Sequence, residues 1–282
     1  MSRGKDYIGP YRRLKMIRAG ATCQVWEVIR DGDSKRLAAK LLQPEYAQKS
    51  EEIEFLRHEY EVAHDFKHPN VIEVYEFNID RGIAYLILEL SIFKNLKLML
   101  RDGMEEITPN VTKIIDQAAE GLKYVHDKGW VHRDIKPDNY LVSPQGDVKL
   151  IDFAISIRPP KGLAKLFARR GKAAGTRSYM SPEQIRGDAL DYRADIYSFG
   201  CMLYELVTGK VPYTGLNADD LLSKHLRAPV PSAVVTNNQI TPEFNALVMR
   251  MMAKNRDERP SSMDDFLKQF RGMRVYKVKL KS

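Results

Sequence analysis

The sequence predicts an α+β fold with two unlike lobes: a small β-sheet carrying one main helix, then a larger and mainly helical part. Short apolar segments separated by turn residues occupy the first 90 residues, and longer segments with helical periodicity occupy the remainder. The chain has 282 residues, of which 44% are hydrophobic, so there is ample material for the cores of both lobes. A cleft between two such lobes is a natural place for a ligand.

Five strand-like segments and one amphipathic helix build the first lobe. The strands are short, apolar and bounded by turn residues, and they are expected at residues 11–17, 25–29, 37–42, 71–78 and 83–90. Between residues 51 and 66, apolar side chains recur at helical spacing, namely Ile53, Leu56, Tyr60 and Ala63. The pattern changes after Ser91, so we place the first lobe at 11–90, behind an N-terminal extension at 1–10.

The second lobe is expected at residues 91–272, followed by a basic tail at 273–282. Its principal helices are predicted at residues 110–126, 195–208, 242–253 and 261–270. The segment 195–208 is apolar on almost every side, which is typical of a helix that runs through the middle of a lobe.

The net charge of +8 limits the classes of partner. A basic chain favours acidic partners, nucleic acid or anionic lipid, although solubility alone also accounts for the charge. The sequence has no zinc-ligand spacing and no interleaving of basic and aromatic residues, so we expect no specific nucleic-acid partner.

The cysteines and the hydropathy limit the location. Cys23 and Cys201 are too few for a disulfide framework, so a reducing, cytoplasmic setting is expected. No apolar run approaches the ~18 residues of a membrane span, and the first ten residues are too polar for a signal peptide. Membrane contact is expected only through an extension outside this sequence or through a basic surface.

The residues with the clearest chemistry lie in VHRDIKPDNYLV, at positions 131–142. Asp134 could accept a proton from an attacking hydroxyl, Lys136 could lie along a transferring phosphoryl group, and Asn139 could hold a metal. Asp152 ends an apolar strand in DVKLIDFA, where a carboxylate can bind a hard cation such as Mg²⁺. Asp152 alone could equally be a turn cap, so the longer segment carries the argument.

With these segments in this order, the chain resembles the eukaryotic-like serine/threonine protein kinases, including their bacterial members, from about residue 11 to 270. The resemblance implies a two-lobed kinase fold whose small sheet is antiparallel. It implies that Lys40, at the end of LAAK, contacts the α- and β-phosphates of ATP and that Glu59 pairs with Lys40. It also implies that Asp134 is the catalytic base and that Asn139 and Asp152 bind the metal, with Mn²⁺ as the alternative to Mg²⁺.

Further positions follow from the same resemblance. Glu183 of the segment SPE is expected to pair with Arg259, and Asp195 to brace the catalytic loop. Leu88 is expected at the back of the nucleotide pocket, with the backbone of Glu89 and Ser91 facing adenine. The nucleotide-binding set is completed by Ile17, Gly20, Val25, Ala38 and Leu141.

The glycine-rich loop of the family is altered in this chain. In IRAGATCQV, at residues 17–25, Gly20 occupies the middle glycine position, and Arg18 and Cys23 occupy the other two. Each residue forced into a left-handed conformation would cost roughly 1–2 kcal/mol, which predicts weaker nucleotide binding or slower turnover. Cys23 is either a redox handle over the nucleotide or a small tolerated hydrophobe.

The segment between Asp152 and Ser181 is unusual. Residues 158–172 are strongly basic, with apolar residues at helical spacing, so a short basic amphipathic helix that docks on an acidic partner, a substrate or a membrane is one interpretation, and a solvated loop is the other. Lys136 and Thr176 imply serine or threonine acceptors, with Thr176 in substrate binding. Arg133 resembles the arginine that receives a regulatory phosphate, and Ser178 is the predicted phosphosite.

The sequence therefore predicts an enzyme that transfers the γ-phosphoryl group of ATP to Ser or Thr of protein substrates with Mg²⁺. Phosphoryl transfer needs mainly positioning and charge neutralisation, which the intact lysine, acids and amide can supply. The alternative is a pseudokinase, a nucleotide-binding scaffold without useful turnover. The altered loop and Ala154, which replaces the family's glycine after Asp152 and Phe153, favour that alternative.

Overall fold

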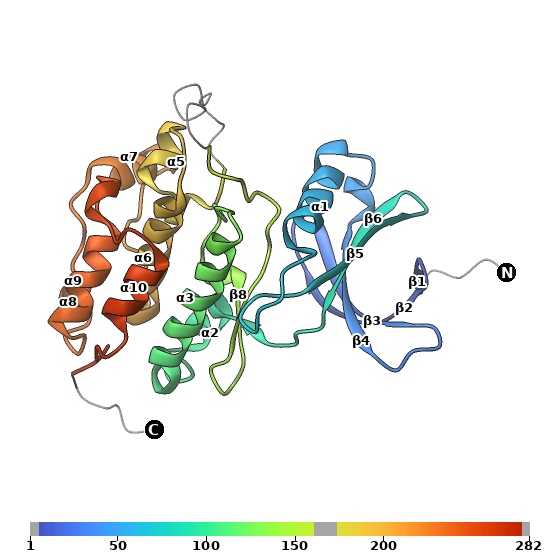
Figure 1. The fold of residues 1–282 in the computed structure, drawn as a ribbon, viewed down its shortest axis with the longest axis horizontal. Helices are drawn as coiled ribbons and strands as arrows, with labels where there is room; N and C mark the ends of the chain where they lie inside the picture. The colour runs from blue at the N-terminus through green and yellow to red at the C-terminus, as the bar shows by residue number, and fades with distance from the viewer. Residues whose placement is uncertain (1–5, 161–173, 278–282) are drawn as a thin grey trace. The chain divides into compact units, whose positions relative to one another are not determined.

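The computed structural model of the chain describes residues 6–160 and 174–277. It divides into two compact units. Unit 1 comprises Met1–Phe93 and Asp152–Ala154, and unit 2 comprises Lys94–Ile151 and Ile155–Ser282. Unit 1 is a sheet with one helix and unit 2 is mainly helical, so the predicted fold class is confirmed (Figure 1).

Unit 1 contains a six-stranded antiparallel sheet in the order β1-β2-β3-β4-β6-β5. The strands are β1 (Tyr7–Ile8), β2 (Tyr11–Ala19), β3 (Cys23–Arg30), β4 (Arg36–Leu42), β5 (Val74–Asp80) and β6 (Ile83–Glu89). The helix α1 (Ser50–Ala63) lies along β5 and β6 (Figure 1). The five predicted strands and the helix are confirmed, with ends that differ by a few residues.

Strand β1 was not predicted, and a close backbone contact explains its position. Gly9 has φ +53°, and a Cβ atom there would lie 2.3 Å from the Tyr85 hydroxyl oxygen. The chain therefore turns tightly over the Tyr85 ring before it enters β2. Around this turn Ile8, Tyr11 and Tyr85 are buried with Val28 in the core of unit 1.

Unit 2 is built on eight described α-helices and a small sheet. The helices are α2 (Leu96–Asp102), α3 (Val111–Asp127), α5 (Pro182–Arg186), α6 (Tyr192–Thr208), α7 (Ala218–Arg227), α8 (Ala233–Thr236), α9 (Pro242–Met251) and α10 (Met263–Phe270), of which α5 and α8 are single short turns. The sheet has the order β7-β8-β9, with β7 (Lys94–Asn95), β8 (Tyr140–Val142) and β9 (Val148–Leu150). Within residues 6–160 and 174–277, no helix has both the length and the apolar character needed to cross a membrane.

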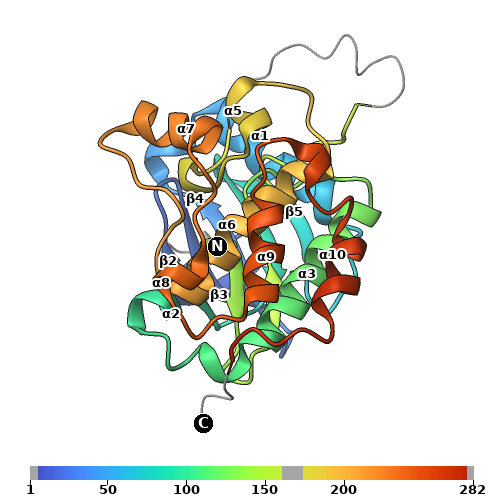
Figure 2. The same ribbon diagram turned by 90° about the vertical axis from the view of Figure 1, so that its left-hand side faces the viewer.

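The helix α6 forms the centre of unit 2, as its sequence predicts. Every residue from Ala194 to Val207 is buried, and α9 packs along it, while α10 packs on α3 (Figure 2). A Cβ atom at Gly200 would lie 2.8 Å from the Cβ atom of Met251, so this glycine allows the close approach of α6 and α9. The four long helices predicted in this part of the chain are α3, α6, α9 and α10, and all are confirmed.

A buried ion pair joins α5 to the segment before α10. The guanidinium of Arg259 donates to both carboxylate oxygens of Glu183, at 2.6 and 2.9 Å, and the two side chains are 0% and 6% exposed. The predicted pairing of Glu183 and Arg259 is therefore confirmed. Removal of one partner would leave a buried charge without its counterion, which is the costly case for such pairs.

A second buried polar group lies on α7. His225 is fully buried, its Nδ1 atom lies 2.9 Å from the Tyr197 hydroxyl, and its ring packs edge-on against Tyr213. Burial and the nearby ammonium group of Lys254 lower the pKa of His225 to about 4. A hydrogen bond with the Ser178 backbone raises the pKa but does not outweigh them. In the folded chain this imidazole is therefore neutral at pH 7 and takes up a proton only near pH 4.

The stability of unit 2 should fall with acidification because of His225. The unfolded chain takes up the proton near pH 6.5 and the folded chain only near pH 4. The contribution of neutral His225 to the free energy of unfolding is therefore complete above pH 6.5. It falls by roughly 3 kcal/mol as the pH drops toward 4. Chemical denaturation at pH 7 and pH 4 should show a smaller loss of unfolding free energy for His225→Gln than for the wild type. Equal losses would contradict this assignment.

Candidate active site

Three charged side chains meet in unit 1. The Nζ atom of Lys40, on β4, donates to Glu59 Oε2 of α1 at 2.6 Å and to Asp152 Oδ1 at 3.3 Å. Glu59 is buried, whereas the Asp152 side chain is 38% exposed. The predicted pairing of Lys40 with Glu59 is confirmed, and Asp152 completes the cluster.

The two carboxylates keep the lysine charged. Burial disfavours the ammonium form of Lys40, but the charges of Asp152 and Glu59 outweigh this effect and raise its pKa. Because opposite charges within a few ångströms favour the ionised form, Lys40 is a fixed cation held between two acids.

Three residues in unit 2 form a hydrogen-bonded array around Asp134. Lys136 Nζ donates to Asp134 Oδ2 at 2.6 Å and to the Thr176 hydroxyl oxygen at 2.7 Å. The Thr176 hydroxyl and backbone N–H both donate to Asp134 Oδ1 at 2.9 Å. The structure thus brings together three predicted site residues from segments forty positions apart in the chain.

A buried carboxylate holds the backbone that precedes Asp134. Asp195 is 0% exposed and accepts from the backbone N–H of His132 at 2.7 Å and of Arg133 at 2.8 Å. Its Oδ2 atom also lies 2.9 Å from His126 Nε2. The predicted bracing of this loop by Asp195 is confirmed.

Two residues next to this chemistry have unusual backbone conformations. Among the described residues, Arg81, Arg133 and Asp152 are the non-glycine residues with φ in the left-handed region, at +48°, +71° and +69°. Such conformations cost free energy and persist where the surroundings enforce them, often at functional sites. Here Asp195 supplies part of that enforcement for Arg133.

The amide of Asn139 is oriented by the same loop. Its Nδ2 atom donates to the Asp134 backbone carbonyl at 2.8 Å and to Asp134 Oδ2 at 3.2 Å. Because the nitrogen faces Asp134, the amide oxygen faces away from it. Oxygen is the atom type that Mg²⁺ prefers, so the orientation suits the predicted metal role of Asn139.

Residues 11–270 match the model of the protein kinase domain. The chain belongs to the protein kinase family.

This kinase domain is similar to bacterial serine/threonine-protein kinases. It is 32% identical to PknH of Mycobacterium bovis over 265 residues, which cover 94% of this chain and 44% of PknH. It is 29% identical to PrkC of Bacillus subtilis over 265 residues, which cover 93% of this chain and 40% of PrkC. It is 32% identical to PknA of Mycobacterium tuberculosis over 233 residues, which cover 81% of this chain and 53% of PknA. The chain thus spans about half or less of the length of these relatives.

The altered glycine-rich loop of the kinase domain is an ordinary hairpin between β2 and β3. The Gly20 N–H donates to the Cys23 carbonyl at 2.8 Å, and neither Arg18, Gly20 nor Cys23 has a positive φ. The cost of forced left-handed residues therefore does not arise here. Gln43 holds the tip, because its amide nitrogen donates to the carbonyl oxygens of Gly20 at 2.7 Å and Ala21 at 3.2 Å.

The thiol of Cys23 is poorly suited to redox chemistry. Burial raises its pKa, and this effect exceeds the opposing influence of Lys40. A raised pKa leaves less of the reactive thiolate, so the structure favours a small packed side chain at this position over a redox handle.

Strand register places several predicted nucleotide-binding residues of the kinase domain together. Val25 lies opposite Lys40, and Ala38, two residues before Lys40, lies opposite Leu88. Side chains two apart on a strand, and those directly opposite, share a face, so these four residues line one face of the sheet in unit 1. Ile17 is on β2, Leu141 is on β8 of unit 2, and Ser91 follows β6.

One predicted backbone contact is restricted by the structure. The Glu89 N–H donates to the Glu73 carbonyl at 2.9 Å, so this group is not the one that contacts a purine. Of the two backbone groups of Glu89, only the carbonyl could therefore make the predicted contact with adenine.

The regulatory predictions stay predictions. Ser178 is half-buried in the short helix Arg177–Tyr179. Arg133 Nη1 donates to the Ile155 carbonyl at 3.3 Å. Of the basic segment, residues 161–173 lie outside the described residues, whereas the Arg158 guanidinium lies 4.3 Å from the centre of the Trp130 ring.

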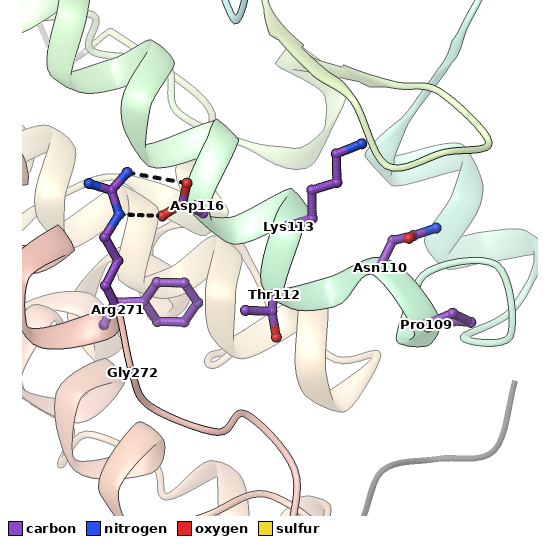
Figure 3. A pocket seen from close by; sticks show the side chains of 8 residues that line it. Pro109, Asn110, Thr112, Lys113, Asp116, Arg271 and Gly272 are labelled. Carbon is purple, nitrogen blue, oxygen red and sulfur yellow. Dashed lines mark hydrogen bonds and ion pairs between the residues drawn. The ribbon is translucent and has the colours of Figure 1, made fainter.

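A surface hollow of unit 2, of about 520 Å³, contains none of the predicted site residues (Figure 3). It is lined by Pro109, Asn110, Thr112, Lys113, Asp116, Phe270, Arg271 and Gly272. Arg271 Nε donates to Asp116 at 2.7 Å, and Lys113 pairs with Asp147 at 2.6 Å. Because these charges already have partners, the hollow offers no evident anion or cation site.

Sequence reasoning missed Gln43 and Gln184. No local pattern identifies Gln43, whose partners lie more than twenty residues away. A capping box, Ser181 followed three residues later by Gln184, was available as a signal for the start of α5, and both of its hydrogen bonds are present.

Loss of the Glu59 carboxylate should make Lys40 less basic. In Glu59→Gln the ammonium keeps only one acidic partner, so its pKa should fall. Amine-specific labelling of Lys40, followed by mass spectrometry between pH 8 and 11, should show its midpoint at lower pH in this variant. Glu61→Gln, an exposed change on the same helix, should leave the midpoint unchanged, and a Glu59→Gln midpoint at or above the wild-type value would refute the interpretation.

Loss of the Gln43 amide should loosen the loop hairpin. Gln43→Leu removes two donors to the tip, each worth about 1 kcal/mol. Hydrogen exchange of a peptide that covers residues 20–25 should become several-fold faster than in the wild type. Gln48→Leu is the matched control, and equal protection in both variants would show that the amide does not hold the tip.

Proposed function

We propose that this kinase domain transfers the γ-phosphoryl group of ATP to Ser or Thr hydroxyls of protein substrates, with Mg²⁺ bound. The observation that carries the proposal is the array of Asp134, Lys136 and Thr176. It sets a carboxylate, a cation and a hydroxyl within hydrogen-bond distance of one another. The similarity to bacterial serine/threonine-protein kinases supports the same substrate class.

In this proposal Asp134 accepts the proton of the substrate hydroxyl. A carboxylate offers about four acceptor positions, and four contacts from Thr176, Lys136 and Asn139 reach the one on Asp134. These contacts orient the base, and one of them gives way when the substrate hydroxyl binds. Lys136 also supplies positive charge beside the oxygen that attacks phosphorus, where negative charge develops during transfer.

Lys40 binds the non-transferred phosphates. Its raised pKa keeps it cationic, and Glu59 and Asp152 hold the ammonium in place. A charged group that is already oriented loses little freedom when the nucleotide arrives. Positioning of this kind is the main contribution that a protein makes to phosphoryl transfer.

Asn139 and Asp152 would hold Mg²⁺, with Mn²⁺ as an alternative. Both offer hard oxygen atoms, and the amide of Asn139 is turned so that its oxygen faces away from Asp134. When bound, the metal neutralises charge on the phosphates. Asp152 would have to share its carboxylate between the metal and Lys40, which the two oxygens of the group allow.

The pseudokinase remains the competing proposal, because Ala154 and the single glycine of the loop set the chain apart from the family pattern. The unstrained hairpin weakens one reason for it. The intact set of Lys40, Glu59, Asp134, Asn139 and Asp152 argues for turnover. An acidic partner of the basic segment and a cytoplasmic location are further proposals that rest on the sequence.

Asp134→Asn should abolish phosphorylation without loss of the fold. The change removes the proton acceptor but keeps the size of the side chain, so we expect transfer to slow by about 10²–10⁴-fold. The measurement is phosphate incorporation from ATP and Mg²⁺ into the protein and a Ser/Thr peptide library, read by mass spectrometry. Asp147→Asn, a surface carboxylate paired with Lys113, is the matched control.

The outcomes separate the two proposals. Equal incorporation by the wild type and Asp134→Asn would defeat the catalytic assignment. Binding of ATP by the wild type with no incorporation would favour the scaffold.

A further inference from the structure

We propose that Gln184 is a positioning residue that clamps the segment carrying Thr176 to the segment carrying Asp134. The proposal rests on the proposed function, since it assigns Gln184 a task in the same reaction. It goes beyond the capping of α5, which uses other atoms of the same side chain.

The amide nitrogen of Gln184 bridges two segments that are distant in sequence. Its Nε2 atom donates to the Arg133 carbonyl at 2.9 Å and to the Ala174 carbonyl at 3.2 Å. Arg133 directly precedes Asp134, and Ala174 lies two residues before Thr176. One buried side chain, 3% exposed, therefore joins the backbones that carry the base and its hydroxyl partner.

The oxygen of the same amide makes a separate contact. Gln184 Oε1 accepts from the Ser181 N–H at 3.1 Å, and the Gln184 N–H donates to Ser181 Oγ at 3.3 Å. These two bonds cap α5 and fix the direction of the side chain. The two N–H donors are thereby aimed at the two carbonyls.

The clamped segments are in close backbone contact. Gly175 has φ +119°, and a Cβ atom there would lie 2.7 Å from the Arg133 carbonyl oxygen and 3.4 Å from Gln184 Nε2. This spacing leaves no room for a side chain at position 175. The two N–H groups on Nε2 supply one donor to each of the two carbonyls.

The other end of the Thr176 segment has its own anchor. Ser198 Oγ of α6 donates to the Tyr179 carbonyl at 2.7 Å, and the Tyr179 hydroxyl donates to Glu205 at 2.5 Å. On the N-terminal side of Thr176, the Gln184 amide is the side-chain anchor of the segment among the described residues. Its loss should loosen the backbone before Thr176, which then depends on its direct bonds to Asp134 and on Lys136, while Tyr179 stays in place.

Gln184→Glu tests the clamp apart from the cap. A glutamate keeps an oxygen for the Ser181 N–H but places an acceptor where the two carbonyls need a donor. We expect kcat for peptide phosphorylation to fall roughly 10- to 100-fold, as for other losses of positioning, with KM for ATP changed less than about twofold. Gln184→Met, which removes both functions, should fall at least as far.

A control variant and a structural measurement complete the test. Asn245→Leu removes an amide whose oxygen accepts from the Ser232 hydroxyl and the Ala233 N–H, a polar anchor of unit 2 outside the clamp. It should lower stability without the change in kcat. Hydrogen exchange of a peptide covering residues 174–180 should become faster in Gln184→Glu and remain unchanged in Asn245→Leu.

Unchanged kcat in a folded Gln184→Glu variant, or unchanged exchange at 174–180, would overturn the clamp. If the wild type proves inactive, the proposed function fails, but the exchange measurement still decides whether Gln184 holds the two segments. A loss of kcat of the same size in Asn245→Leu would show that general destabilisation, and not positioning, causes the effect.

Discussion

The arrangement of the catalytic segment in unit 2 depends on the buried carboxylate of Asp195. It lies on the central helix α6, which is packed on almost every side, and it accepts from two successive backbone N–H groups at 132 and 133. A carboxylate with several N–H donors is strongly held, and it cannot be solvated if those donors move away. The buried central helix of the unit thus sets the path of the backbone up to Asp134.

The elements with strong periodicity could be predicted, and the short ones could not. The long helices α3, α6, α9 and α10 and the strands that flank Lys40 repeat apolar residues often enough to reveal their type. The two-residue strands β1 and β7 are too short to show a period. Strand β1 forms because the turn at Gly9 packs on Tyr85 and lets Tyr7 pair with Arg12, and β7 forms because Lys94 pairs with Val142. Their pairing is a product of tertiary structure.

The candidate site was predicted largely from the resemblance to protein kinases, residue by residue. That reasoning named Lys40 and Glu59, which contact each other in unit 1, and Asp134 and Thr176, which contact each other in unit 2. It could not name the amides of Gln43 and Gln184, because each binds carbonyl groups whose position only the folded chain defines. It also assigned strain to the loop at Arg18 and Cys23, whereas the hairpin turns without left-handed residues. Glycine count alone was therefore a poor guide to the loop's backbone.

The bidentate pair of Glu183 and Arg259 has a consequence for how this sequence can change over evolutionary time. Replacement of both by apolar residues would leave the carbonyls of Ala253 and Arg193 without the guanidinium, and either single replacement would strand one charge in the interior. A stepwise exchange of the charged pair for an apolar pair therefore passes through a single variant that folds poorly. The residues at positions 183 and 259 should therefore be retained or changed together among descendants of this sequence.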